Sequence, residues 1–396
     1  MSRPATVSRM GERLRERAEA NERFFTAEAD RIARLCHRMA ERFAAEGRLV
    51  AFAATPAARS DARHVAVEFV HPVIVGKRAL PALALAGEGG DAAAQVEVVC
   101  EPGDVALGFG EGVEAATAVA RARGCLTVGF RPGSGAEWEL VPPTTDPAVA
   151  QELVETLYHV LWELVHVFFD HRGLLEGRTA RTVHDTGASS FLYPFLGEQE
   201  HDLEAVVADV RRSVLMKADE VTALRAQTLS EGAEPLAAAA AAVRSAFEAG
   251  GQLLALGNGG SATDAMDLVA DLRAPAFGWP PRRALDLTED AGILTAIAND
   301  IGTDAIFSRQ VIAYGRPGDV LLVLSTSGNS LSVIEALREA RRRGLATVAL
   351  VGYDGGRVAH EELADHVVIT RSEHIPRVQE AQASAYHVLR ELVERP

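Results

Sequence analysis

The chain has 396 residues, of which 48% are hydrophobic and 24% charged, and its formal net charge is −15. This length predicts two or three globular domains, each able to bury a core of its own. The negative charge argues against nucleic acid or an anionic membrane as the main partner. It does not exclude a small phosphorylated ligand, because backbone amides bind phosphate without a basic surface.

The targeting and redox features of the sequence predict a cytoplasmic protein. The first 25 residues are charged throughout, which is not the pattern of a signal peptide. The three cysteines are odd in number and form no C-x-x-C pair, which is typical of reduced thiols. The alanine run at 237–242 is short and flanked by Pro235 and Arg244, so it predicts a helix and not a membrane span.

In chain order, each half opens with a long charged helical stretch, at residues 13–43 and 201–229, and then alternates short apolar runs with helical ones. Near-continuous apolar runs between helices are typical of buried parallel strands. We therefore expect two flavodoxin-like, doubly wound α/β domains whose ligand sites lie at the carboxyl ends of the strands. In the second half these runs occupy 252–257, 283–287, 319–326, 346–352 and 366–370.

The stretch at 177–197 has weak periodicity and many small residues, which predicts an inter-domain linker. The expected domains are therefore 1–176 and 198–396.

Three pairs of segments indicate that the second half is a duplication of the first. The sequence "GRLVAFA" from Gly47 resembles "GQLLALG" from Gly251, and "PGDVAL" from Pro102 resembles "PGDVLL" from Pro317. Near the end of each half, "YHVLWELV" resembles "YHVLRELV". The three segments occur in the same order in both halves, and the number of residues that separates each matching pair grows along the chain. This is expected for two copies of one domain with different loop lengths.

A glycine-rich loop, "GNGGS", follows the first apolar run of the second half and comprises Gly257, Asn258, Gly259, Gly260 and Ser261. Its glycines permit a tight turn, and its serine stands where a helix should begin, so amide donors gather at the positive end of a helix dipole. The loop also fits the loose dinucleotide fingerprint G-x-G-x-x-[GA], which is a weak signal by itself.

A second loop, "STSGNS", follows the run at 319–326 and brings four hydroxyls to the end of a strand, those of Ser325, Thr326, Ser327 and Ser330. The alternative is an ordinary turn rich in serine and threonine. Two donor-rich loops after neighbouring strands suit one phosphate group, whereas a pyrophosphate needs only the first loop. The pair therefore favours a phosphorylated ligand and no nucleotide cofactor.

The second half resembles the sugar isomerase (SIS) fold, in particular its sedoheptulose 7-phosphate isomerase branch. The resemblance covers about 198–396 and extends through the repeat, in eroded form, to the first half. It implies a phosphosugar ligand held by the serine loops, with Asn299 and Asp300 near the sugar. The segments that carry it are "LLALGNGGSATDAMDLVADL", "AIANDIGTDAIFSRQV", "RPGDVLLVLSTSGNSLSVIEAL" and "VQEAQASAYHVL".

That branch carries a His-x3-Glu pair after the first loop and a Gln-x7-His pair on its closing helix. In the second half the matching positions are Asp267, Asp271, Gln379 and His387, so both members of the first pair are aspartates. This departure argues against catalysis by the second half alone. The resemblance still implies that the last three of these residues contact the substrate.

The first half differs from that branch in its loops and not in the four paired positions. Pro56 and Glu111 stand in its loops, where they remove an amide donor and add a negative charge. However, with one residue inserted in the first loop, the branch's four positions are occupied by His64, Glu68, Gln151 and His159.

The spacing of these four residues permits a shared site. His64 and Glu68 share a helix face, and Gln151 and His159 lie two turns apart on another helix. Two imidazoles, a carboxylate and an amide oxygen are able to hold a zinc-like ion. The alternative is a pair of structural core histidines, with Glu155 simply pairing with His159.

The second half keeps the two phosphate loops, and the first half keeps the four catalytic positions. We therefore expect the two halves to act as a covalent pseudo-dimer. The second half would bind phosphate, Glu68 would move a proton between C1 and C2 through an enediol, and His159 would act as the acid. One zinc ion per chain is expected at the four residues of the first half, and the protein is expected to be a homo-oligomer, a dimer of pseudo-dimers. The alternative is a non-catalytic phosphosugar-binding protein, regulatory or scaffolding, of the same fold.

Overall fold

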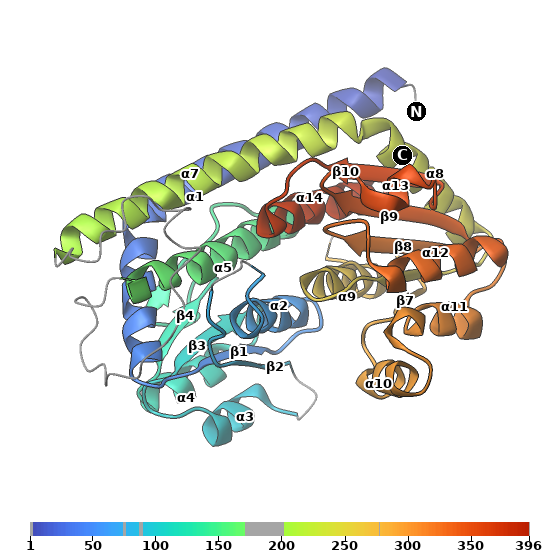
Figure 1. Cartoon of the computed structure of the whole chain (residues 1–396). Helices are drawn as coiled ribbons and strands as arrows, with labels where there is room; N and C mark the ends of the chain where they lie inside the picture. Colours follow the sequence, from blue (N-terminus) through green and yellow to red (C-terminus); the bar gives the residue numbers. More distant parts are fainter. Residues whose placement is uncertain (1–2, 74–76, 87–89, 171–201, 277, 396) are drawn as a thin grey trace. The chain divides into compact units, whose positions relative to one another are not determined.

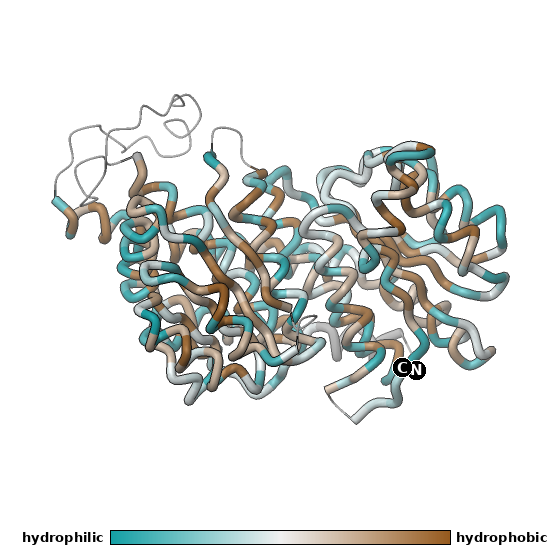
Figure 2. Tube along the Cα trace, turned by 90° about the horizontal axis from the view of Figure 1, so that it is seen from below, coloured by the Kyte–Doolittle hydropathy of each residue, from teal (hydrophilic) through white to brown (hydrophobic). Residues whose placement is uncertain are grey.

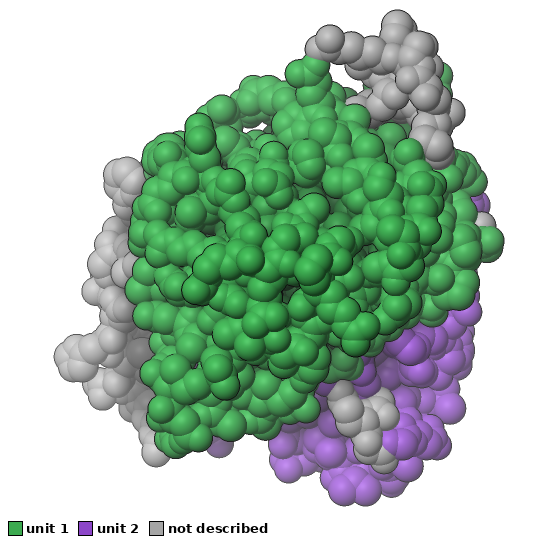
Figure 3. Space-filling model, turned by 90° about the vertical axis from the view of Figure 1, so that its right-hand side faces the viewer, with its two compact units in different colours: residues 1–19, 147–152, 220–396 green, residues 20–146, 153–219 purple. Residues whose placement is uncertain are grey.

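The computed structural model describes residues 3–73, 77–86, 90–170, 202–276 and 278–395 (Figure 1). The predicted linker at 177–197 lies outside the described residues. The chain divides into two compact units, coloured separately in Figure 3. The C-terminal unit consists of Met1–Glu19, Pro147–Glu152 and Glu220–Pro396, and the N-terminal unit consists of Ala20–Asp146 and Leu153–Asp219. The units are therefore interleaved in the sequence, and the predicted division at 177–197 stays a prediction.

The N-terminal unit is built on a five-stranded parallel sheet with the strand order β2-β1-β3-β4-β5. Its strands are β1 (Leu49–Ala53), β2 (Ala82–Leu85), β3 (Val105–Phe109), β4 (Leu126–Gly129) and β5 (Trp138–Glu139). The helices of the first half of the chain are α1 (Arg3–Ala44), α2 (Arg59–Val70), α3 (Ala92–Val99), α4 (Glu114–Ala122) and α5 (Pro147–Asp170). Helices α1 and α5 contribute residues to both units.

The C-terminal unit is built on a second five-stranded parallel sheet with the order β10-β9-β8-β6-β7. Its strands are β6 (Leu253–Leu256), β7 (Ala284–Asp286), β8 (Val320–Ser325), β9 (Ala346–Gly352) and β10 (His366–Thr370). The helices of the second half are α7 (Leu203–Glu231), α8 (Ala233–Glu248), α9 (Gly260–Arg273), α10 (Ala291–Asp300), α11 (Ser308–Tyr314), α12 (Leu331–Arg342), α13 (Gly356–His360) and α14 (Ile375–Glu394), with a 3-10 turn, η2 (Thr303–Ala305).

The two sheets have the same topology. In each, the first strand in the chain lies between the second and the third, and the fourth and fifth continue outward, which is the flavodoxin-like order 2-1-3-4-5. All five apolar runs predicted in the second half are strands, β6 to β10. The predicted fold class is therefore confirmed for both halves.

The core of the C-terminal unit explains why the sequence of each strand is an unbroken apolar run. Leu253 and Ala255 of β6 pack into a cluster that α8, α9 and α14 complete, while Leu254 and Leu256 pack into a second cluster with α11, α12 and α13. Because both faces are covered, every position of the strand is buried. The strands accordingly include the most hydrophobic segments of the trace (Figure 2). Among the described helices, none is long and apolar enough to cross a membrane.

The repeated "PGD" turn has the same structural role in both units. Asp104 accepts hydrogen bonds from the backbone N–H groups of Arg48 (2.8 Å) and Glu101 (2.9 Å), and Asp319 accepts them from Gln252 (3.0 Å) and Arg316 (3.0 Å). Each aspartate thus ties the start of one central strand to the turn before the next. The preserved aspartate is therefore explained by folding and not by catalysis.

Candidate active site

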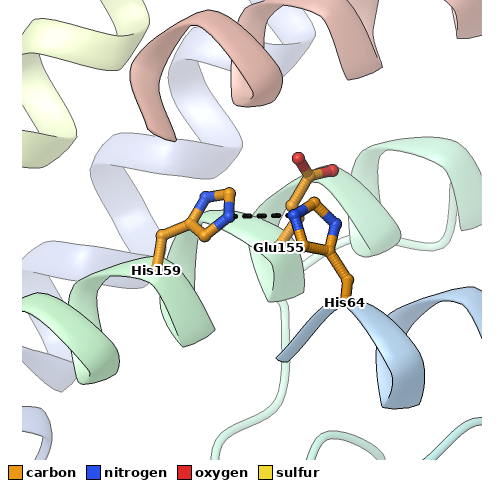
Figure 4. A group of neighbouring side chains, drawn as sticks. All are labelled: His64, Glu155 and His159. Carbon is orange, nitrogen blue, oxygen red and sulfur yellow. Dashed lines mark hydrogen bonds between the residues drawn. The ribbon is translucent and has the colours of Figure 1, made fainter. Parts of the chain in front are cut away.

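The N-terminal unit holds a buried cluster of two histidines and a glutamate (Figure 4). His64 lies on α2, and Glu155 and His159 lie one turn apart on α5. The two imidazole rings point toward each other with their Nε2 atoms 3.3 Å apart, and the Glu155 carboxylate lies beside the His64 ring. One ligand atom from each of the three residues lies within 4.8 Å of the others.

Glu68 lies next to this cluster. It follows His64 by one turn of α2, and its Oε1 atom is 3.7 Å from His64 Nε2. The structure therefore brings together three of the four residues predicted for this site. The fourth, Gln151, belongs to the C-terminal unit, and its membership of the site stays a prediction.

The donor set of the cluster fits a zinc ion. Burial, followed by the nearby His159, lowers the pKa of His64 well below its ordinary value, so this imidazole is neutral at physiological pH and its lone pair is available. Two nitrogens that bind one tetrahedral zinc ion at about 2.0–2.1 Å lie about 3.3–3.4 Å apart, close to the observed separation of 3.3 Å between the Nε2 atoms.

The equivalent position in the C-terminal unit is occupied by an ion-paired cluster. His387 Nε2 is 3.3 Å from Asp267 Oδ2, so the pair repeats the spacing of His159 and His64. His387 Nδ1 is 3.0 Å from Glu152 Oε1, and the Ser384 hydroxyl donates to the other oxygen of that carboxylate. Tyr386 donates its phenolic hydrogen to Asp267 Oδ2 over 2.9 Å.

These contacts keep His387 charged. Burial opposes the charged imidazolium, but the hydrogen bonds and negative charges of Asp267 and Glu152 outweigh it and raise the pKa of His387 to about 10. Burial likewise opposes ionisation of Glu152, yet the positive charge of Arg17 and the contacts with His387 hold the pKa of this carboxyl far below its usual range. Arg17 donates to both carboxylate oxygens at 2.9–3.1 Å. An imidazolium that donates through both nitrogens has no lone pair for a metal.

Asp271, at the position equivalent to Glu68, is also ion-paired. Its Oδ2 atom is 3.2 Å from Nε of Arg390, whose side chain is only 2% exposed. Burial raises the pKa of Asp271, against the lowering effect of Arg390. Arg390 is the one residue that differs between the two "YHVL" repeats, where the first half has the buried, uncharged Trp162. The substitution therefore pairs the acidic residue of the C-terminal unit with an arginine.

The two predicted phosphate loops lie side by side in the C-terminal unit. They follow β6 and β8, which pair in parallel, and the Asn258 side chain donates to Ser332 Oγ at the start of α12 over 3.1 Å. Helix α9 begins at Gly260, directly after Gly259 with its positive φ of 59°. A side chain at Gly257 would come within 2.2 Å of the Ser261 carbonyl oxygen, so the tight turn requires glycine there.

The serine loop is shaped by its own hydroxyls. Ser325 Oγ accepts from the Gly328 N–H (3.1 Å) and Ser327 Oγ accepts from the Asn329 N–H (3.2 Å). Ser330 occupies the N-cap position of α12 without a side-chain capping bond. The arrangement places hydroxyl and amide donors at the amino end of a helix, which favours an anion.

The other residues predicted to contact the sugar stay predictions. Asn299 and Asp300 end α10, a helix without a buried residue, and the Asn299 amide donates to Asp300 over 2.7 Å. Neither side chain bonds to the serine loops within the described part of the chain. Gln379 is buried on α14. In the N-terminal unit, the loop after β3 exposes Glu111, which pairs with Arg131 at 2.8 Å.

Two residues of the ion-paired cluster, Glu152 and Arg17, were not identified from the sequence. They lie 135 positions apart, and Glu152 lies 235 positions from His387, so no local pattern connects them. Arg390 could have been identified, because it is the one mismatch in an otherwise identical repeat.

Known proteins resemble this chain in sequence and in fold. A family model described as the SIS domain matches residues 218–352. Phosphoheptose isomerase of Chlorobaculum parvum is 47% identical over 163 residues, which cover 40% of this chain and 77% of the relative. Phosphoheptose isomerase of Rhodospirillum rubrum is 43% identical over 173 residues, which cover 42% of this chain and 88% of the relative.

A solved structure resembles nearly the whole chain. The C-terminal domain of glucosamine-fructose-6-phosphate aminotransferase from Francisella tularensis superposes with a TM-score of 0.59 at 10% identity, covering 96% of this chain and 93% of that one. At this identity the likeness shows the fold alone. With most of two curated relatives covered at more than 40% identity, the chain belongs to the SIS-domain family that includes the phosphoheptose isomerases.

Proposed function

We propose that the protein is a phosphosugar aldose–ketose isomerase that converts sedoheptulose 7-phosphate into a heptose 7-phosphate. The observation that carries the proposal is the buried group of Glu68, His64 and His159, in a chain whose other unit retains both donor-rich loops. The relatives named phosphoheptose isomerase support the choice of substrate.

Substrate binding is assigned to the C-terminal unit. Amides and hydroxyls of the two loops bind the phosphate, with Ser325, Ser327 and Ser330 supplying side-chain donors. These donors lie at the amino ends of α9 and α12. The partial positive charge of each helix end favours a phosphate although the net charge of the protein is negative. Asn299, Asp300, Gln379 and His387 remain proposed contacts of the sugar.

Proton transfer is assigned to the N-terminal unit. Glu68 removes the proton from C1 of the ketose, and His159 donates a proton to the oxygen on C2, which gives the enediol. Glu68 then returns its proton to C2 while His159 recovers the proton from the oxygen on C1. The product has the same atoms as the substrate, so no oxidant or reductant is needed.

A zinc ion fits beside these groups, with His64 and His159 as nitrogen ligands. When bound, it would polarise the carbonyl and stabilise the negative charge on the enediolate oxygens. We assign the protein to the cytoplasm, where thiols remain reduced, and expect a homo-oligomer.

The deciding experiment is a coupled assay of ketose-to-aldose conversion on sedoheptulose 7-phosphate with the full chain. Turnover that is lost in Glu68→Gln supports the isomerase. The ion-paired His387 and Asp271 instead favour the second candidate, a non-catalytic phosphosugar-binding protein. Binding of the sugar phosphate without any turnover would establish that second function.

A further inference from the structure

We infer that the segment at the end of β9, residues 352–356, positions the serine loop for phosphate binding. We call this segment, "GYDGG", the supporting loop, and it lies with the serine loop in the C-terminal unit. The inference deepens the proposed function and rests on it for the identity of the ligand. It makes Asp354 and Gly356 positioning residues and not contacts of the substrate.

The serine loop needs support because most of it lies between two regular elements. β8 ends at Ser325, which pairs with Val351 of the neighbouring strand β9, and α12 begins at Leu331 (Figure 1). The five residues between them, 326–330, belong to neither element. Donors that are held in one geometry bind more tightly, because ordering them at the moment of binding costs free energy.

The amino end of α13, directly after the supporting loop, is hydrogen-bonded to the serine loop. The Arg357 N–H donates to Asn329 Oδ1 over 2.9 Å, and the Val358 N–H donates to the Gly328 carbonyl oxygen over 3.1 Å. Two consecutive amides thus hold two consecutive residues of the serine loop.

Gly328 and Asn329 in turn orient the serine hydroxyls. The Gly328 N–H donates to Ser325 Oγ (3.1 Å), and the Asn329 N–H donates to Ser327 Oγ (3.2 Å). Each hydroxyl therefore uses a lone pair within the loop and keeps its hydrogen available for a phosphate oxygen. A shift of Gly328 or Asn329 would change the direction of both hydroxyls.

The backbones of the two loops are packed so closely that they require glycine. Gly356 has a φ of 53°, and a Cβ atom there would lie 2.3 Å from the Ser327 carbonyl oxygen. Gly328 has a φ of 63°, and a Cβ atom there would lie 2.2 Å from the Gly355 carbonyl oxygen. A side chain at either position would therefore displace one loop from the other. Asp354 fixes the turn, because its Oδ1 atom accepts from the Gly356 N–H over 3.1 Å.

The test measures the affinity of the full chain for sedoheptulose 7-phosphate and for inorganic phosphate by isothermal titration calorimetry. Gly356→Ala should weaken the binding of both by at least about tenfold, because the displaced Ser327 loses a hydrogen bond to a charged group. Wild-type affinity in Gly356→Ala would show that the supporting loop serves folding alone and would overturn the inference. A wild type that binds neither ligand would overturn it as well.

Gly250→Ala is the matched control. Gly250 also has a positive φ, of 82°, but it precedes β6 at the opposite edge of the sheet, and within the described part of the chain a Cβ atom there would meet nothing within 4 Å. This variant should lose stability, because alanine is strained at positive φ, and its affinity should change by less than about threefold. An equal loss of affinity in Gly250→Ala would attribute the effect to backbone strain and overturn the inference.

A second pair of variants decides the question if Gly356→Ala does not fold. Asp354→Ala and Asp354→Asn both remove a negative charge, but only asparagine keeps an oxygen that can accept from the Gly356 N–H. The side chain of Asp354 is 65% exposed, so neither change disturbs the core. Asp354→Ala should bind sedoheptulose 7-phosphate about threefold more weakly than Asp354→Asn, since one hydrogen bond is lost. Equal affinities would overturn the inference.

Kinetics separate the inference from the proposed function. The phosphate group does not react, so Gly356→Ala should raise KM and change kcat by less than about threefold. A wild type that binds sedoheptulose 7-phosphate without turnover, and whose affinity falls in Gly356→Ala, would refute the isomerase and keep the supporting loop. Turnover in a Gly356→Ala variant with wild-type affinity would do the reverse.

Discussion

Replacing His387 by glutamine should destabilise the C-terminal unit in a strongly pH-dependent way. His387 bridges Glu152 and Asp267, and these contacts raise its pKa from 6.5 to about 10. A histidine with a higher pKa in the folded protein than in the unfolded chain contributes its full stabilisation below about pH 6.5. The contribution falls as the pH rises and vanishes above about pH 10.

The size of the effect follows from the shift. Each pH unit between the ambient pH and the folded pKa corresponds to about 1.4 kcal/mol, so the charged His387 contributes roughly 3 kcal/mol at pH 7.5 and almost nothing at pH 10.5. Loss of one partner from a buried ion pair typically costs a similar 3–5 kcal/mol. His387→Gln should therefore lower the free energy of unfolding by about 3 kcal/mol at pH 7.5.

Urea unfolding followed by circular dichroism at pH 7.5, 9 and 10.5 measures this difference. The gap between wild type and His387→Gln should close as the pH rises, because wild-type His387 loses its charge over that range. His360→Gln is the matched control, since His360 lies in the same unit with a side chain that is 63% exposed. A gap of the same size at all three pH values would show that His387 is not held as an imidazolium.

Two further predictions concern substrate binding and proton transfer. Ser327→Asp should abolish the thermal stabilisation by sedoheptulose 7-phosphate, because a carboxylate would lie where the phosphate binds, while Ser230→Asp on α7 should not; stabilisation that survives Ser327→Asp would exclude this loop as the phosphate site. Glu68→Gln should lower turnover in the coupled assay by at least about a hundredfold, as expected for the loss of a general base. Asp271→Asn should lower it by less than about tenfold, since Asp271 is already paired with Arg390, and the opposite order would reverse the assignment of tasks to the units.

The sequence was sufficient to predict the strands and the presence of two domains with the same topology. Buried parallel strands leave contiguous apolar runs, and β6 to β10 coincide with the runs expected. The positions of the two predicted phosphate loops, after β6 and β8, were predictable for a similar reason, because their glycines and hydroxyls are contiguous in the chain. Patterns of this kind are contiguous in the sequence, so they can be recognised without knowledge of the tertiary contacts.

The ion-paired cluster was not predictable, because its members meet only in the folded protein. Glu152 is separated by more than a hundred positions from both Arg17 and His387, and it comes from a short segment of α5 that belongs to the C-terminal unit. The interleaving of the two units in the chain was missed for the same reason. Glu155 was noted from its spacing to His159, but the spacing did not show that it also lies near His64.

The contrast between the two units leads to a last prediction about metal content. Metal binding requires deprotonated ligands, and His387 is held protonated between two carboxylates while Asp267 is shared with Tyr386. His64, by contrast, has a depressed pKa and faces a second imidazole. Zinc analysis of the purified full chain should therefore give about one ion per chain, lost in His64→Ala and retained in Asp267→Ala. Two ions per chain, or loss in Asp267→Ala, would mean that the C-terminal cluster binds metal despite its ion pairs. A metal-free chain with full turnover would remove zinc from the proposal and leave Glu68 and His159 to transfer the protons alone.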